Sequence, residues 1–119
     1  REITDALAQA ATQLANHLHA AALLTLTESG GTSRAISKYR PRAPILAVTT
    51  SAEVSRRLAL NWGVTPLRVA DGPDDARIAA GLEEAKARGC ARAGDVVIVT
   101  AGISREVGST NLVRVVRVP

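Results

Sequence analysis

Two hydrophobic patterns alternate along the 119 residues of this chain. The first is a helical spacing of apolar residues near the start, at Ile3, Leu7, Ala11, Leu14 and Leu18. The second is a short, continuous apolar run, which is typical of a strand buried on both faces. Such runs predict five strands: Ala21–Leu26, Pro44–Thr49, Val64–Val69, Asp95–Thr100 and Leu112–Val118.

Helices are predicted between the first four strands. A short helix over Arg34–Tyr39 stops before Pro41, because the residue before a proline avoids helical backbone angles. The next helix starts with the capping box Thr50–Glu53 and runs to about Asn61. Its predicted apolar face consists of Val54, Leu58 and Trp62.

A further helix starts near Asp71, with Pro73 suited to its first turn, and ends at Gly89. Its predicted apolar stripe is Ile78, Ala79, Leu82 and Ala85. Alternation of helices and strands predicts an α/β fold of three layers, α/β/α, around a doubly wound sheet of five strands. The sheet is mostly parallel, and the last strand is antiparallel because no helix separates it from the strand before. We expect one domain over residues 1–119.

The strand containing Pro66 is expected at one edge of the sheet, because proline cannot donate a backbone hydrogen bond to a neighbouring strand. The last strand is expected at the other edge. It is rich in valine and contains no proline before Pro119, so its open edge can pair with a second copy. Arg114 and Arg117 discourage random pairing there.

A loop of hydroxyl residues and glycines follows the first strand. Its candidate phosphate-binding residues are Thr27, Glu28, Ser29, Gly30, Gly31, Thr32 and Ser33. The glycines let the backbone approach a ligand, the hydroxyls can donate to phosphate oxygens, and the next helix offers unpaired N–H groups. The same pattern is also typical of an ordinary polar turn. Glu28 has no evident partner in the sequence and is expected to be solvated.

A second polar loop, Ala101–Thr110, follows the fourth strand. If the first and fourth strands are neighbours, the two loops flank one crevice at the carboxyl ends of the strands, where α/β sheets bind ligands. Arg105 in this loop is placed to meet a phosphate, although a solvated side chain is the alternative.

Composition and charge exclude several classes of function. The net charge of +4 comes from scattered basic residues, and there are two aromatic residues, so no nucleic-acid partner is expected. The single cysteine, Cys90, excludes an internal disulfide, and no metal ligand set is found. His17 and His19 point to different sides of their helix.

No apolar run is long enough to cross a membrane, and no signal peptide is seen. No set of catalytic residues emerges. Because the chain starts at Arg1 without a methionine, we expect a piece of a longer protein or a missing start.

Five segments carry a family resemblance. They are Thr27-Glu-Ser-Gly-Gly-Thr, Tyr39-Arg-Pro-Arg-Ala-Pro-Ile-Leu-Ala-Val-Thr49, Val54-Ser-Arg-Arg-Leu-Ala-Leu60 with Trp62-Gly63, Gly94-Asp-Val-Val-Ile-Val-Thr-Ala-Gly102, and Gly108-Ser-Thr-Asn-Leu112. Together they resemble the C-terminal domain of bacterial pyruvate kinase, in the right order and over nearly the whole chain. The resemblance implies a domain that is not catalytic, so the isolated chain is expected to be inactive. It needs no cofactor of its own; the barrel that binds phosphoenolpyruvate, ADP, Mg and K belongs to the parent enzyme.

The resemblance also implies an allosteric effector site and a subunit interface. The family's phosphate loop falls on Thr27–Thr32, and its second effector loop includes Arg105, Gly108 and Ser109. The interface is expected on the last strand, at Asn111, Val113, Val115 and Arg117. Members that answer to fructose 1,6-bisphosphate often carry a basic residue where Glu28 stands. The expected effector is therefore AMP or a sugar phosphate, with sulfate or phosphate as a stand-in.

The expected partners are the catalytic domains of the parent chain and further copies in a homo-oligomer, and the expected location is the cytoplasm. Two alternatives stay open. The chain could be a free-standing sensor of a phosphorylated metabolite, or a purely structural oligomerisation module.

Overall fold

The computed structural model describes residues 2–28, 30–101 and 112–119. Helices and strands alternate as the apolar pattern predicts. Their order is α1 (Glu2–Leu18), β1 (Ala22–Leu26), α2 (Gly31–Lys38), β2 (Ile45–Thr49), α3 (Ala52–Leu58), β3 (Val64–Arg68), α4 (Asp74–Ala87), β4 (Val96–Ala101) and β5 (Leu112–Arg117).

The five strands form one sheet in the order β3-β2-β1-β4-β5. The first four strands run parallel, and β5 pairs antiparallel with β4. The predicted α/β class and mostly parallel sheet are therefore confirmed. Pro66 lies on edge strand β3, opposite Ala47, and β5 is the other edge. Strands β1 and β4 are parallel neighbours, with Thr25 opposite Thr100, so both strands end at the same edge of the sheet.

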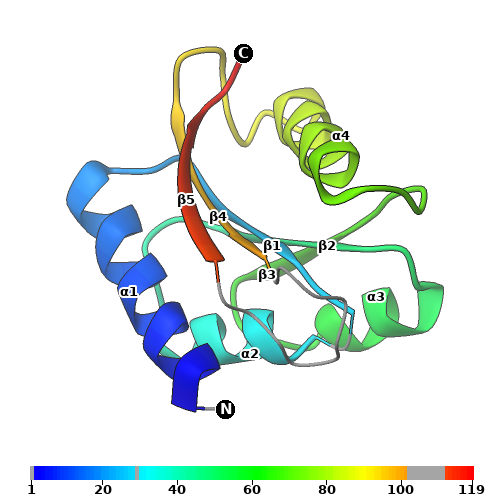
Figure 1. Ribbon diagram of the computed structural model, residues 1–119, viewed down its shortest axis with the longest axis horizontal. Coiled ribbons are helices and arrows are strands. Elements are labelled where there is room, and N and C mark those ends of the chain that lie inside the picture. The colour runs from blue at the N-terminus through cyan, green and yellow to red at the C-terminus, as the bar shows by residue number, and fades with distance from the viewer. Residues whose placement is uncertain (1, 29, 102–111) are drawn as a thin grey trace.

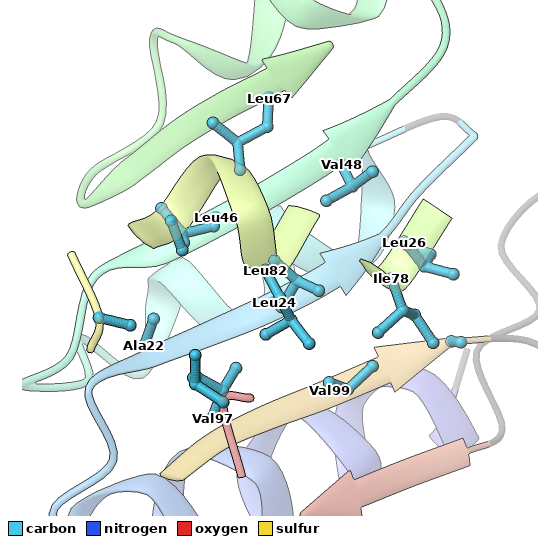
Figure 2. Packing of buried hydrophobic residues seen from close by; sticks show 14 residues of the cluster. Ala22, Leu24, Leu26, Leu46, Val48, Leu67, Ile78, Leu82, Val97 and Val99 are labelled. Atoms are coloured by element: carbon cyan, nitrogen blue, oxygen red, sulfur yellow. The ribbon is translucent and has the colours of Figure 1, made fainter. Parts of the chain in front are cut away.

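Helices cover both faces of the sheet, which makes three layers (Figure 1). Helices α1, α2 and α3 pack on one face through Ala8, Ala11, Ile36 and Val54, which join one apolar cluster with β1, β2 and β4. Helix α4 covers the other face, and Figure 2 shows its Ile78 and Leu82 directed onto the strands. The members of this second cluster that Figure 2 labels are Ala22, Leu24, Leu26, Leu46, Val48, Leu67, Ile78, Leu82, Val97 and Val99.

Close packing of α4 depends on Gly81. A Cβ atom at this position would lie 2.9 Å from Cγ2 of Val48 and 3.0 Å from Cδ1 of Leu24. The predicted stripe of this helix included Ala79, which is exposed, and did not include Gly81, which is buried.

The predicted helix faces need two further corrections. Helix α1 buries small residues, Ala8, Ala11 and Ala15, whereas Ile3 and Leu18 are exposed. Small side chains let the helix approach the sheet closely, so the buried stripe is rotated away from the two large residues at the helix ends. Helix α3 ends at Leu58 rather than near Asn61, and Trp62 lies in the turn beyond it.

No helix in the described part of the chain combines the length and apolarity needed to cross a bilayer.

Candidate functional site

The loop between β1 and α2 is a tight, internally bonded turn. The Gly30 N–H donates to Oγ1 of Thr27 at 2.6 Å, and the Gly30 carbonyl accepts from Oγ of Ser33 at 3.1 Å. The turn needs glycine because Gly30 has φ of +91°, and a Cβ there would lie 2.7 Å from Cδ2 of Leu58. The hydroxyls of Thr27 and Ser33 therefore hold the shape of the loop, and Ser29 lies outside the described residues.

Helix α2 begins inside this loop. Gly30 is its N-cap, and the first turn of the helix contains no acidic residue. Thr32 and Ser33 in that turn are buried. The N-terminal end of a helix carries a partial positive charge, so the place where the loop meets α2 favours an anion.

A buried arginine lies on the other side of the loop. Arg77, in the first turns of α4, is 3% exposed. Its Nη1 lies 3.3 Å from Oε1 of Glu28, and its Nη2 lies 2.6 Å from Oδ1 of Asp74. The expectation that Glu28 has no partner is therefore wrong. A buried charge is unfavourable unless it is paired, and both carboxylates lie within pairing distance of this guanidinium.

One donor of this arginine stays unused among the described residues. Nε of Arg77 is buried and makes no hydrogen bond to any of them. Both carboxylates are more accessible than the cation, since the side chains of Glu28 and Asp74 are 36% and 37% exposed. The site thus pairs a buried cation with two partly exposed carboxylates.

Arg77 was not predicted from the sequence, and its burial is a finding of the structure. Arg77, Gly81 and Ala85 are spaced four residues apart and are all buried. Residues spaced by four lie on one face of a helix, so Arg77 shares the buried face of α4 with two small residues.

The other predicted site residues are only partly described. Arg105, Gly108, Ser109 and Asn111 lie outside the described residues. On β5, Val113 and Val115 lie opposite Thr100 and Ile98, and Val115 is 49% exposed. Nη1 of Arg117 donates to the Gly94 carbonyl at 2.8 Å. The predicted interface residues that the structure describes thus lie on an edge strand, whose outer side is unpaired in the described part of the sheet.

No group of His, Cys, Asp or Glu side chains among residues 2–28, 30–101 and 112–119 could hold a metal ion.

The fold and the loop define the class of this protein as an open α/β sheet with a candidate anion site at the carboxyl ends of its strands. The family described as "Pyruvate kinase, alpha/beta domain" matches residues 5–116. The chain is 45% identical to pyruvate kinase 2 of Synechocystis over 115 residues, which is 95% of this chain and 20% of that protein. It is 39% identical to pyruvate kinase of Clostridium acetobutylicum, over 97% of this chain and 25% of that protein.

A mammalian relative is nearly as similar. Pyruvate kinase PKLR of the rat is 38% identical over 99% of this chain and 22% of that protein. This chain belongs to the pyruvate kinase alpha/beta-domain family and corresponds to the C-terminal domain that its motifs resemble. It spans a fifth to a quarter of the length of these relatives.

Proposed function

We propose that this chain is the regulatory domain of a pyruvate kinase and that it binds a phosphorylated metabolite at Thr27–Ser33 and Arg77. The parent enzyme transfers a phosphoryl group from phosphoenolpyruvate to ADP in the cytoplasm, and this domain regulates that activity. The observation that carries the proposal is the buried guanidinium of Arg77, which lies 3.3 Å from the loop residue Glu28 and has an unused Nε donor among the described residues.

The chemistry of the site suits a single phosphate group. Phosphate oxygens accept hydrogen bonds from hydroxyls, backbone N–H groups and a guanidinium, and charge-assisted bonds to arginine are among the strongest. Glu28 now occupies one side of that guanidinium. A phosphate that binds Arg77 replaces the carboxylate, and Glu28 moves into the solvent that it already partly faces.

The charge of Glu28 also selects among effectors. A second phosphate group near this carboxylate would be repelled, because like charges at short range are unfavourable. AMP or a sugar monophosphate therefore fits the site better than a sugar bisphosphate.

Calorimetric titration of the full-length protein with AMP and with a sugar monophosphate tests this proposal. Replacing Ser29 and Thr32 by alanine should weaken binding at least tenfold, because each hydrogen bond to a charged group contributes roughly 1.5–3 kcal/mol. Arg77→Met should weaken it by at least as much. The matched control is Arg88→Met, since Arg88 lies on the same helix and pairs with Glu84 on the surface. Unchanged affinity in both test variants would remove these residues from the site.

The substitution Glu28→Gln should change the affinity for phosphate in the opposite direction. The amide keeps the shape of the side chain but releases the cation, so the affinity for inorganic phosphate should rise severalfold. If it falls instead, Glu28 binds the effector rather than competing with it.

We propose assembly through β5 as a second role of this domain. The strand is an edge, its outer side stays unpaired in the described part of the sheet, and Val115 is half exposed. Two copies can pair there by two-fold symmetry. Val115→Pro removes a backbone donor and should shift a dimer to monomer in sedimentation, with circular dichroism to check that the fold survives. A dimer that resists the change would place the contact elsewhere.

Activity separates the regulatory domain from the two alternatives. The 119-residue chain should not form pyruvate from phosphoenolpyruvate and ADP, whereas the full-length protein should. A gene no longer than this chain would favour a free-standing sensor, and an effector site that binds no phosphate would favour a structural module.

A further inference from the structure

One aspartate of the chain is followed directly by a glycine. The pair is Asp71-Gly72, whereas every other aspartate or asparagine precedes a residue with a side chain. In such a pair the backbone nitrogen of the glycine can attack the aspartate side chain, because glycine has no Cβ atom to shield the nitrogen and permits unusual backbone angles. The sequence therefore contains one bond at which this reaction meets the least steric hindrance.

The structure places the pair in a segment that is open to solvent. Strand β3 ends at Arg68 and α4 begins at Asp74, so the pair belongs to neither element. Asp71 is exposed and lines a hollow of about 550 Å³ at the carboxyl ends of β2 and β3, which gives water access to its carboxyl group. A Cβ atom added at Gly72 would have one neighbour within 4 Å among the described residues, Cβ of Ala76 at 3.9 Å. The glycine is therefore not crowded.

The two groups that have to react are already close. The Gly72 N–H donates to Oδ1 of Asp71 at 2.9 Å. Since Oδ1 is bonded to Cγ, the nitrogen lies beside the carbon atom that it would attack.

The other aspartates lack this combination of features. Asp5, Asp74 and Asp75 lie within helices, where neighbouring turns fix the backbone. Asp95 is followed by Val96, a β-branched residue that begins β4.

We propose that Asp71-Gly72 is a site of spontaneous isoaspartate formation in the folded protein. The Gly72 nitrogen forms a bond to Cγ of the protonated Asp71 carboxyl group, and the hydroxyl of that group leaves as water with the amide proton. The product is a cyclic imide. Water then opens the imide: attack at Cγ restores aspartate, and attack at the backbone carbonyl carbon gives isoaspartate, in which the main chain continues through the side-chain carbonyl. The reaction consumes no oxidant, reductant or cofactor.

The modification falls next to the candidate effector site. Isoaspartate lengthens the main chain by one methylene group just before Pro73, whose carbonyl accepts from the Arg77 N–H at 3.0 Å in the first turn of α4. The same turn carries Asp74, which lies 2.6 Å from Nη2 of Arg77. A longer connection changes where this turn lies relative to Glu28, which Arg77 contacts at 3.3 Å. We expect the modification to weaken phosphate binding, a consequence that rests on the proposed function.

Ageing of the full-length protein tests the modification. The unmodified protein is compared with Gly72→Ala and Asp71→Glu. Gly72 lies outside the left-handed φ region, so alanine fits there without strain, and glutamate keeps the carboxylate but would need a larger ring. After incubation at neutral pH, isoaspartate is located by mass spectrometry of peptides and counted by enzymatic methylation of its free carboxyl group.

The unmodified protein should form at least about tenfold more isoaspartate at Asp71 than Gly72→Ala does, because the added Cβ atom hinders ring closure. Asp71→Glu should form none at this position. Isoaspartate that is equally abundant at Asp74 or Asp75 would overturn the proposal. Formation in denaturant alone would also overturn it, because the native loop would then protect the bond.

The same samples are titrated calorimetrically with inorganic phosphate. The affinity should fall severalfold as isoaspartate accumulates in the unmodified protein, and it should stay constant over the same time in Gly72→Ala. A fresh protein that binds no phosphate contradicts the proposed function. An aged protein that contains isoaspartate and keeps its affinity contradicts only the coupling inferred here.

Discussion

The two ends of the parallel strands differ in which kind of side chain is buried and which is exposed. At the carboxyl ends, polar groups are buried: Arg77 is 3% exposed, and Thr32 and Ser33 are buried with it. At the amino ends, apolar groups are exposed, with Leu60 at 87%. A charge removed from water needs an opposite charge, and an apolar side chain left in water is more stable when covered. The two ends therefore differ in what they bury: a paired charge lies out of water at one end, and apolar side chains lie in water at the other.

The largest difference in stability between the two ends is expected from alanine substitutions at two glycines, because Gly30 is closely packed and Gly63 is not. Gly30 has φ of +91°, and a Cβ atom added there would clash with the side chain of Leu58. Gly63 has φ of +68°, and an added Cβ atom would have no neighbour within 4 Å. We expect Gly30→Ala to lower the free energy of unfolding by about 3 kcal/mol, from backbone strain plus overpacking, and Gly63→Ala by about 1 kcal/mol, from strain alone. Urea unfolding measures both. Equal losses would show that the carboxyl-end loop is not closely packed.

The buried cation should contribute more to stability than a surface arginine. We expect Arg77→Met to lower the free energy of unfolding by about 2 kcal/mol, less than for a fully buried pair because both carboxylate partners are partly solvated. Arg88→Met, which breaks a surface pair with Glu84, should cost about 0.5 kcal/mol or less. Thermal or urea unfolding of the two variants decides the matter, and a neutral Arg77→Met would mean that the guanidinium is not needed for folding.

The protein should become more stable when either of two threonines near the carboxyl ends of the strands loses its hydroxyl. Thr25 and Thr100 are adjacent across β1 and β4, are fully buried, and have no hydrogen-bond partner for Oγ1 among the described residues. Replacing either by valine should raise the free energy of unfolding by about 1 kcal/mol, because an unpaired buried hydroxyl is unfavourable. A loss of stability on equilibrium unfolding would reveal a partner for the hydroxyl. Effector affinity in the same variants would show whether the hydroxyls serve the site.

The smallest effect is expected where a polar contact lies in solvent. The Tyr39 hydroxyl donates to both carboxylate oxygens of Asp5 at 3.0 Å, and this bond, with partial desolvation and the negative charge, raises the pKa of Tyr39 above 10.0. The raised pKa favours the protonated phenol in the fold. Its stabilisation is therefore complete below pH 10.0 and is lost as the pH rises through the folded-state pKa. Tyr39→Phe should remove this alkaline dependence, and identical unfolding curves of both proteins from pH 9 to about 11.5 would contradict it.

The candidate site was predictable in part. The loop Thr27–Ser33 could be identified because hydroxyls and glycines between a buried strand and a helix are a local pattern. Arg77 could not, since it is 49 residues from Glu28 in the chain and meets it only when α4 folds back over β1. Burial of a charge is a property of what surrounds it, and no local pattern specifies that surrounding.

The sequence by itself determined the order of the elements, the parallel sheet, and the edge positions of β3 and β5, because apolar runs, proline and the missing last helix act locally. Only the tertiary structure decided which helix face is buried. Ala8, Ala11, Ala15 and Gly81 face the sheet, while Ile3 does not, because close approach of a helix to a sheet favours small side chains over the most apolar ones. The tertiary structure also decided that Arg77 meets Glu28 and that Trp62, in the turn beyond α3, is half exposed.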